Sequence, residues 1–141
     1  MALRRTKRRS GGQAIIEFAL LLPLLLLVLV GITEFGRALM TVNVLNQAAR
    51  EGARVAAIGY DNAAVTERIM EVLSAARISP TDGGIVIDYP DPSDTNKKVT
   101  VTVNSEFAFL GGDILPVDPT ISLTGRAVMR YEASLRLVAK D

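Results

Sequence analysis

A long, almost purely apolar run lies near the N-terminus. Residues 14–32 read AIIEFALLLPLLLLVLVGI and carry a single charge, that of Glu17. A helix over this range is about 28 Å long, close to the thickness of the hydrocarbon core of a bilayer. The run therefore predicts a transmembrane helix over residues 13–33. Pro23 lies inside it, at a place where a membrane helix tolerates a kink.

Beyond the run, apolar residues recur at helical spacing and predict that the helix continues as a stalk to about Gly59. A stripe of small residues, Ala48, Gly52 and Ala56, follows one face of this stalk. Such a stripe lets another backbone approach closely, either the domain's own sheet or a helix of a neighbouring subunit. Packing within the chain's own fold is the commoner of these roles.

A second helix is expected to begin at Asp61 or Asn62, which can cap it, and to run to about Ile78. Three strands are then expected, over residues 85–89, 99–109 and 121–132. The last two alternate apolar and polar residues, which predicts one buried face and one solvated face. The residues expected to face inward are Val99, Val101, Val103, Phe107 and Phe109, then Ile121, Leu123, Ala127, Met129 and Tyr131.

Together these elements predict an α+β protein, with a long N-terminal transmembrane and stalk helix, a second helix and a small antiparallel three-stranded sheet. We expect a basic leader over residues 1–12, the membrane helix over 13–33, and an extracytoplasmic α+β domain over 34–141.

Charge sets the expected orientation. Five of the 16 Lys and Arg residues lie within the first 12 positions, where no acidic residue occurs. This cluster predicts a cytoplasmic N-terminus and an exported domain, as in a single-pass protein of the cytoplasmic (inner) membrane. The rest of the chain has 11 basic against 15 acidic residues, so no nucleic-acid partner is expected.

Composition also restricts the chemistry. The chain has no cysteine and no histidine, which removes thiol nucleophiles, disulfides and imidazole acid–base catalysis. None of the common hydrolase, zinc-protease, P-loop or dinucleotide motifs occurs, so we expect no enzyme activity, cofactor or small-molecule substrate. The carboxylates of the loop Asp88–Asn96 are of a type that binds calcium, but they lack EF-hand spacing, and an ordinary polar turn is expected there.

The N-terminal segment Ser10-Gly11-Gly12-Gln13-Ala14-Ile15-Ile16-Glu17-Phe18 resembles the signal of type IV prepilins. More specifically, the chain is similar to the TadE-like family of minor pseudopilins of the Tad (Flp) tight-adherence pilus. Further residues that carry the similarity are Glu34-Phe35-Gly36-Arg37 and Asn46-Gln47-Ala48-Ala49-Arg50-Glu51-Gly52-Ala53-Arg54. Phe18 stands where many major pilins have Tyr, which favours a minor pseudopilin.

The resemblance implies cleavage between Gly12 and Gln13 by a membrane prepilin peptidase, and a role in assembling a pilus or a related secretion machine. Glu17 would be the fifth residue of the product, used in processing or in aligning subunits. Expected partners are membrane lipid, the peptidase, other pilins or pseudopilins and Tad assembly proteins. Residues expected to pack against helices or subunits are Phe18, Pro23, Phe35, Ala48, Gly52 and Ala56.

Three alternatives remain open. The first is an uncleaved, membrane-anchored extracytoplasmic binding module, in which exposed loops carry the function. The second is a secretory signal peptide with Gly36 and Ala38 near its cleavage site, although the apolar run is longer than the ~7 to 15 residues usual for such signals. The third is a serine–lysine hydrolase.

Overall fold

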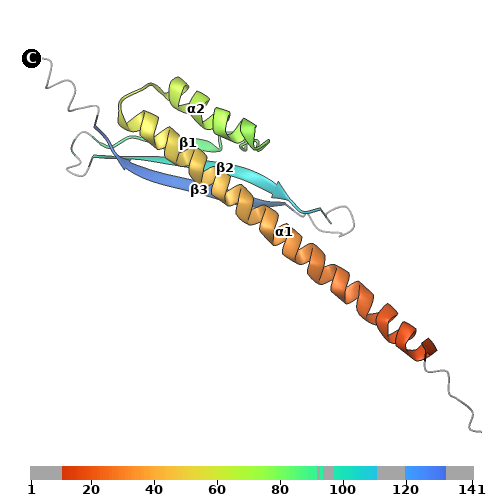
Figure 1. The fold of residues 1–141 in the computed structure, drawn as a ribbon. Helices are drawn as coiled ribbons and strands as arrows, with labels where there is room; N and C mark the ends of the chain where they lie inside the picture. Colours follow the sequence, from red (N-terminus) through yellow and green to blue (C-terminus); the bar gives the residue numbers. More distant parts are fainter. Residues whose placement is uncertain (1–10, 92, 94–96, 111–119, 133–141) are drawn as a thin grey trace, which may run out of the picture. The chain divides into compact units, whose positions relative to one another are not determined.

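The structure, a computed structural model, describes residues 11–91, 93, 97–110 and 120–132. Its elements are α1 (Gly11–Ala57), α2 (Asn62–Ala75), β1 (Ile85–Asp88), β2 (Lys98–Ala108) and β3 (Thr120–Arg130), shown in Figure 1. The described residues form an antiparallel sheet in the order β1-β2-β3. The predicted α+β class, with one long N-terminal helix, a second helix and three strands, is confirmed. Most of the predicted leader lies outside the described residues.

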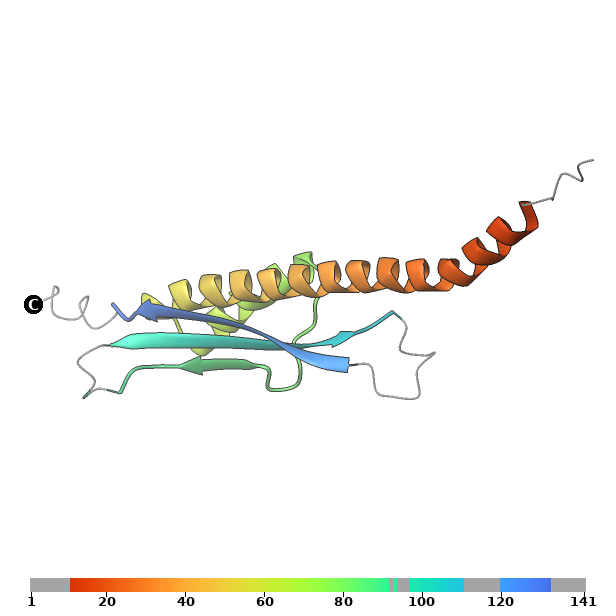
Figure 2. The same cartoon turned by 90° about the horizontal axis from the view of Figure 1, so that it is seen from below.

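The chain divides into two compact units, Met1–Phe35 and Gly36–Asp141. In the first unit the described residues belong to α1, and their large apolar side chains are between 40 % and 75 % exposed. Pro23 does not end the helix, which remains α-helical on both sides of it. Figure 2 shows a bend in the red, N-terminal part of α1.

The second unit has two layers. Figure 2 shows the C-terminal part of α1 and the whole of α2 on one face of the sheet. Because side chains alternate between the two faces of a strand, every second residue of β2 points toward these helices. The core joins residues of both helices to β2 and β3, and its members include Leu45, Ala49, Val65, Ile69, Leu73, Val99, Val101, Val103 and Ala127.

The inward face is not covered at one end of the sheet. Phe109 lies just past the end of β2 and is 37 % exposed, and Ile121, near the start of β3, is 42 % exposed. Ile121 pairs with the buried Phe107 and so shares the inward face as predicted, but neither Ile121 nor Phe109 is buried. A polar residue, Ser105, instead occupies an inward position of β2, where its hydroxyl donates to the carbonyl of Ser79 at 2.7 Å. This bond satisfies the buried hydroxyl, which would otherwise be costly to bury.

The second helix is capped at both ends. The carboxylate of Asp61 accepts a hydrogen bond from the backbone N–H of Ala64 at 3.0 Å, as an N-cap residue does. At the other end, Ile78 donates its N–H to Leu73, and Arg77 adopts a positive φ of 57°. This Schellman arrangement ends α2 at Ala75, earlier than the predicted end near Ile78.

A close backbone contact joins α1 to β3. A Cβ atom added at Gly125 would lie 2.5 Å from both the carbonyl oxygen of Leu45 and the N atom of Asn46. The Asn46 side chain also accepts a hydrogen bond from the backbone N–H of Arg126 at 3.2 Å. Only a residue without a side chain permits this approach, so Gly125 sets the distance between helix and strand.

Candidate functional site

The residues of the predicted processing site lie in the first turns of α1. The side-chain amide of Gln13 donates to a carboxylate oxygen of Glu17 at 3.3 Å, because residues four apart share a helical face. A Cβ atom added at Gly12 would meet nothing within 4 Å. Gly12, Gln13 and Glu17 are all exposed, so nothing described in the chain blocks access to the Gly12–Gln13 bond.

Glu17 is the one charge of the apolar run, and the bond from Gln13 comes from a neutral amide. A carboxylate at membrane depth costs about 2.5 to 3.5 kcal/mol on insertion scales and usually has a cationic partner or a functional role. Of the residues in this segment, Glu17 is therefore the one that most requires a positively charged partner.

The rest of the run presents its side chains outward. Phe18, Pro23 and Phe35 are exposed, and none of the most apolar stretch of α1 is buried within the chain. Among the described residues, α1 is the single helix long and apolar enough to cross a membrane. This helix is suited to one membrane span.

The small-residue stripe has the opposite environment. Ala48, Gly52 and Ala56 are all buried inside the second unit. A Cβ atom added at Gly52 would lie 2.6 Å from the side chain of Ile69 on α2 and 3.5 Å from that of Val101 on β2. The stripe thus permits close packing within the chain's own domain and leaves no free surface for a neighbouring helix at these positions.

An ion-pair network that sequence reasoning missed joins the two helices. Arg68 of α2 reaches Glu51 of α1 at 3.2 Å and Glu71 of α2 at 2.6 Å, and Glu51 also pairs with Arg54. The hydrogen bonds that Arg68 donates to Glu71, and next those to Glu51, raise the pKa of its guanidinium. Such exposed pairs fix orientation more than they stabilise. The i,i+3 spacings are visible in sequence, but the contact between helices is not.

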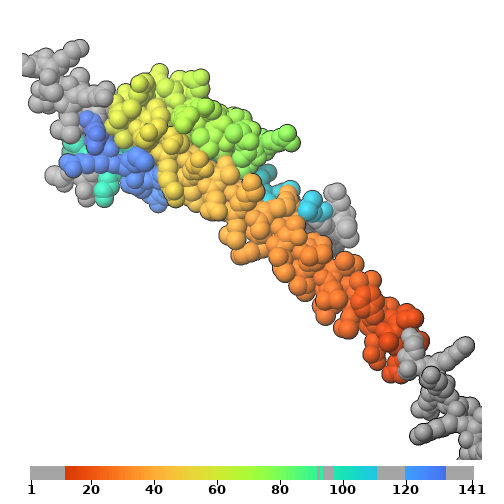
Figure 3. Space-filling model, viewed as in Figure 1, coloured from red at the N-terminus to blue at the C-terminus, as the bar shows by residue number. Residues whose placement is uncertain are grey.

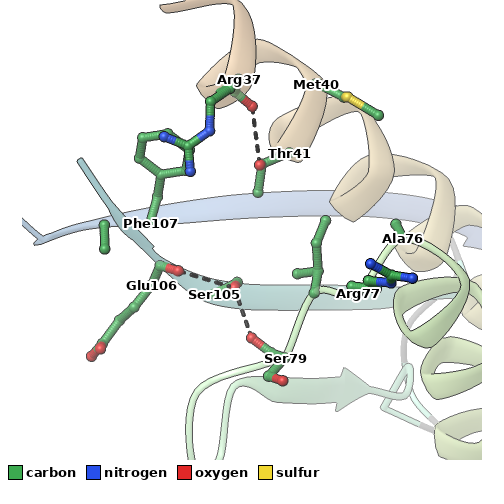
Figure 4. A pocket seen from close by; sticks show the side chains of 11 residues that line it. Arg37, Met40, Thr41, Ala76, Arg77, Ser79, Ser105, Glu106 and Phe107 are labelled. Carbon is green, nitrogen blue, oxygen red and sulfur yellow. Dashed lines mark hydrogen bonds between the residues drawn. The ribbon is translucent and has the colours of Figure 1, made fainter. Parts of the chain in front are cut away.

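Two shallow grooves lie in the second unit. One, of about 400 Å³, is lined by α1, the end of β2 and the segment after α2, and it is shown in Figure 4. There the Arg37 guanidinium lies 5.1 Å from the centre of the Phe107 ring, a cation–π contact, while Ser105 is bonded to Ser79. The other, of about 460 Å³, lies between α1 and α2 and includes Met40 and Arg68.

The loop considered for calcium is only partly described. Asp91 accepts hydrogen bonds from the N–H and the hydroxyl of Ser93, which lower the pKa of its carboxyl group. Within the described part of the chain, no group of three acidic residues is placed to hold a metal ion. Residues 92 and 94–96 of this loop, like residues 111–119, lie outside the described residues.

A comparison with protein families decides what this N-terminal site belongs to. A family model described as TadE-like protein matches residues 12–54. This segment of the chain is TadE-like. The match agrees with the resemblance seen in the sequence. No curated protein and no solved structure matches the chain.

The TadE-like segment covers part of the fold only. It begins at Gly12 and ends at Arg54, three positions before the end of α1, so α2 and the sheet lie outside the match. It contains the processing residues and the predicted packing residues Phe18, Pro23, Phe35, Ala48 and Gly52, whereas Ala56 lies two positions beyond its end. The family likeness therefore resides in α1 alone, in both its exposed and its buried half.

Proposed function

We propose that this protein is a minor pseudopilin of a Tad pilus or a related secretion machine. It is cleaved after Gly12 by a prepilin peptidase and anchored in the cytoplasmic membrane by the first half of α1. The observation that carries the proposal is the TadE-like match, which starts at the glycine of the Gly12–Gln13 bond and includes Glu17 and the exposed apolar helix.

The local structure suits proteolysis at this bond. Proteases require an extended substrate, and Gly12 lies in the first turn of α1 beside Gly11. Glycine destabilises a helix by roughly 1 kcal/mol relative to alanine, so two adjacent glycines at a helix end make local unwinding inexpensive. The peptidase therefore needs to open only the weakest turn of the helix.

Cleavage would also meet the need of Glu17 for a cation. Hydrolysis of the Gly12–Gln13 bond leaves a positively charged amine on Gln13, four residues before Glu17 and on the same helical face. That amine is able to pair with Glu17 of the same chain or of a neighbouring subunit, which neutralises the carboxylate in the apolar layer. Processing thus converts a costly charge into an ion pair available for subunit alignment.

The role proposed is structural rather than enzymatic. The exposed apolar side chains of α1 contact lipid and the helices of other pilins or pseudopilins, while the basic leader sets a cytoplasmic N-terminus before it is cleaved off. The peptidase and the Tad assembly proteins are the partners implied. The α+β domain then lies outside the cytoplasm.

The test is the N-terminal sequence and intact mass of the protein recovered from its native membrane, beside a Gly12→Leu variant. We expect the wild-type chain to start at Gln13 and the variant to remain full length. Gly31→Leu is the matched control, because a side chain is free of contacts at both glycines and both lie in the same helix.

A mature N-terminus at Gln13 in the wild type and the control, lost only in Gly12→Leu, supports the proposal. A full-length chain in all three overturns it in favour of the uncleaved binding module. Cleavage nearer Gly36 or Ala38 would instead identify a secretory signal peptide.

A further inference from the structure

One end of the second unit exposes an unusual group of apolar side chains. Met40 and Leu110 are 67 % and 68 % exposed, the highest values among the large apolar residues of this unit. Leu39, Phe109 and Ile121, also exposed, belong to the same end. We call Leu39, Met40, Phe109, Leu110 and Ile121 the apolar end. Exposed apolar patches on soluble surfaces are small, and larger ones mark sites of interaction.

Contacts around Phe107 bring three of these residues, Ile121, Phe109 and Met40, to one place. Phe107 pairs with Ile121 across the β2–β3 ladder and packs edge-on against Phe109 at 5.4 Å. Arg37 lies over the same Phe107 ring, and the groove beside it is lined by both Arg37 and Met40. The two segments thus meet around Phe107, with Leu110 next in the chain after Phe109. Figure 3 shows the cyan end of β2 beside the orange part of α1.

Two residues of the apolar end follow the exposed apolar run closely in the sequence. The second unit starts at Gly36, directly after the exposed apolar helix, and Leu39 and Met40 follow Phe35 by four and five residues in the same helix. That spacing is about 6 to 8 Å along a helix, which is roughly the thickness of one headgroup layer of a bilayer. Ile58, at the far end of the helix, is about 30 Å from Arg37.

The charge pattern fits a lipid surface as well. Arg37 is the first basic residue after the apolar run. An arginine at this depth places its aliphatic stem along apolar surface and its guanidinium among phosphate groups. The rings of Phe107 and Phe109 lie beside this arginine, so the surface combines apolar side chains with a cation, as interfacial membrane contacts do.

We propose that the apolar end of the domain is seated in the headgroup layer of the bilayer, so that lipid covers Leu39, Met40, Phe109, Leu110 and Ile121. The domain is then held against the membrane at a second place besides its anchor, with Arg37 at the phosphates. This inference rests on the anchoring part of the proposed function, but not on cleavage or on pilus assembly.

The test uses the full-length protein in vesicles of phosphatidylcholine and phosphatidylglycerol. The chain has no cysteine, so single substitutions Leu110→Cys, Met40→Cys, Ile58→Cys and Leu25→Cys each accept one environment-sensitive fluorophore. Nitroxide-bearing lipids added at increasing fractions then quench the labels that touch lipid. Ile58→Cys is the matched control, since Ile58 is also an exposed apolar residue of the domain.

We expect strong quenching at position 25, several-fold more quenching at positions 110 and 40 than at position 58, and blue-shifted emission at 110 and 40. Quenching at 25 with equal, water-like emission at 110, 40 and 58 overturns the lipid-seated end and leaves the anchor intact. Absence of quenching at 25 overturns both. Protection at 110 that grows with the protein-to-lipid ratio, without lipid quenching, assigns the surface to a second copy and also overturns the inference.

Discussion

The two halves of α1 use apolar residues in opposite ways. The first half is rich in leucine, and its large side chains are exposed, whereas the second half buries alanine and glycine against a sheet. Small residues suit the buried half because they let α2 and β2 come close, as Gly52 shows with Ile69. Large residues suit the exposed half because lipid or another helix contacts them from outside. Hydrophobicity alone therefore does not identify the core of this protein, because apolar stretches of one helix are exposed in the first half and buried in the second.

The same substitution in each half gives the largest expected difference. Leu45→Ala should lower the free energy of unfolding of the domain by about 3 kcal/mol, because it leaves a cavity beside a fully buried side chain. Leu25→Ala should leave it unchanged, because Leu25 is exposed in the first unit. Denaturant unfolding in detergent, followed by tyrosine fluorescence, measures this, since all three tyrosines lie after residue 35. Equal losses for the two variants would contradict the comparison.

Substitutions at two glycines test the same comparison with a smaller expected loss of stability. Gly125→Ala should destabilise the domain by about 2 kcal/mol, since the added Cβ atom meets the backbone of α1, which cannot move as a side-chain tip does. Gly36→Ala is the control, because the space around Gly36 is open and alanine favours a helix. The same unfolding assay applies. A Gly125→Ala protein as stable as Gly36→Ala would show that helix and strand are not held at this distance.

The smallest effect concerns pH. Burial is the main cause that raises the pKa of the Tyr89 phenol above its ordinary 10.0, and the neighbouring Tyr131 adds to it. A raised pKa in the folded state means that the contribution of Tyr89 is complete below the unfolded pKa and is lost as pH rises through the folded one. As pH rises above about 10 the unfolding midpoint should fall, and Tyr89→Phe should reduce that slope. An unchanged slope in the variant would assign the pH dependence to other groups.

Periodicity along the chain predicted most of the fold. The long apolar run, the helical spacing after it and the alternation in β2 and β3 indicated the elements, and Asp61 indicated the start of α2. The details that failed depend on neighbours in space. Arg77 follows the end of α2 with a positive φ although it is not a glycine, and Glu34, a charged residue just after the apolar run, is only 6 % exposed. Neither the positive φ of Arg77 nor the burial of Glu34 can be predicted from the spacing of residues along the chain.

The sequence alone predicted some parts of the candidate site and missed others. Gly12, Gln13 and Glu17 form a local motif, so the sequence alone singled them out, and the family match covers them. The stripe at Gly52 was also visible, but its partner was not, because Ile69 and Val101 lie far away in the chain. The Glu51–Arg68 contact and the cluster around Phe107 were missed for the same reason.

The hydrogen bond that the backbone N–H of Arg126 donates to Asn46 affects how β3 can pair with strands of other molecules. β3 is an edge strand, and unpaired edges invite strands from other molecules to add to a sheet. Here a side chain of α1 already occupies one backbone donor of that edge, and the helix backbone lies against Gly125 beside it. An incoming strand would first have to displace the asparagine. Addition of a strand from another copy is therefore disfavoured at the β3 edge of the sheet.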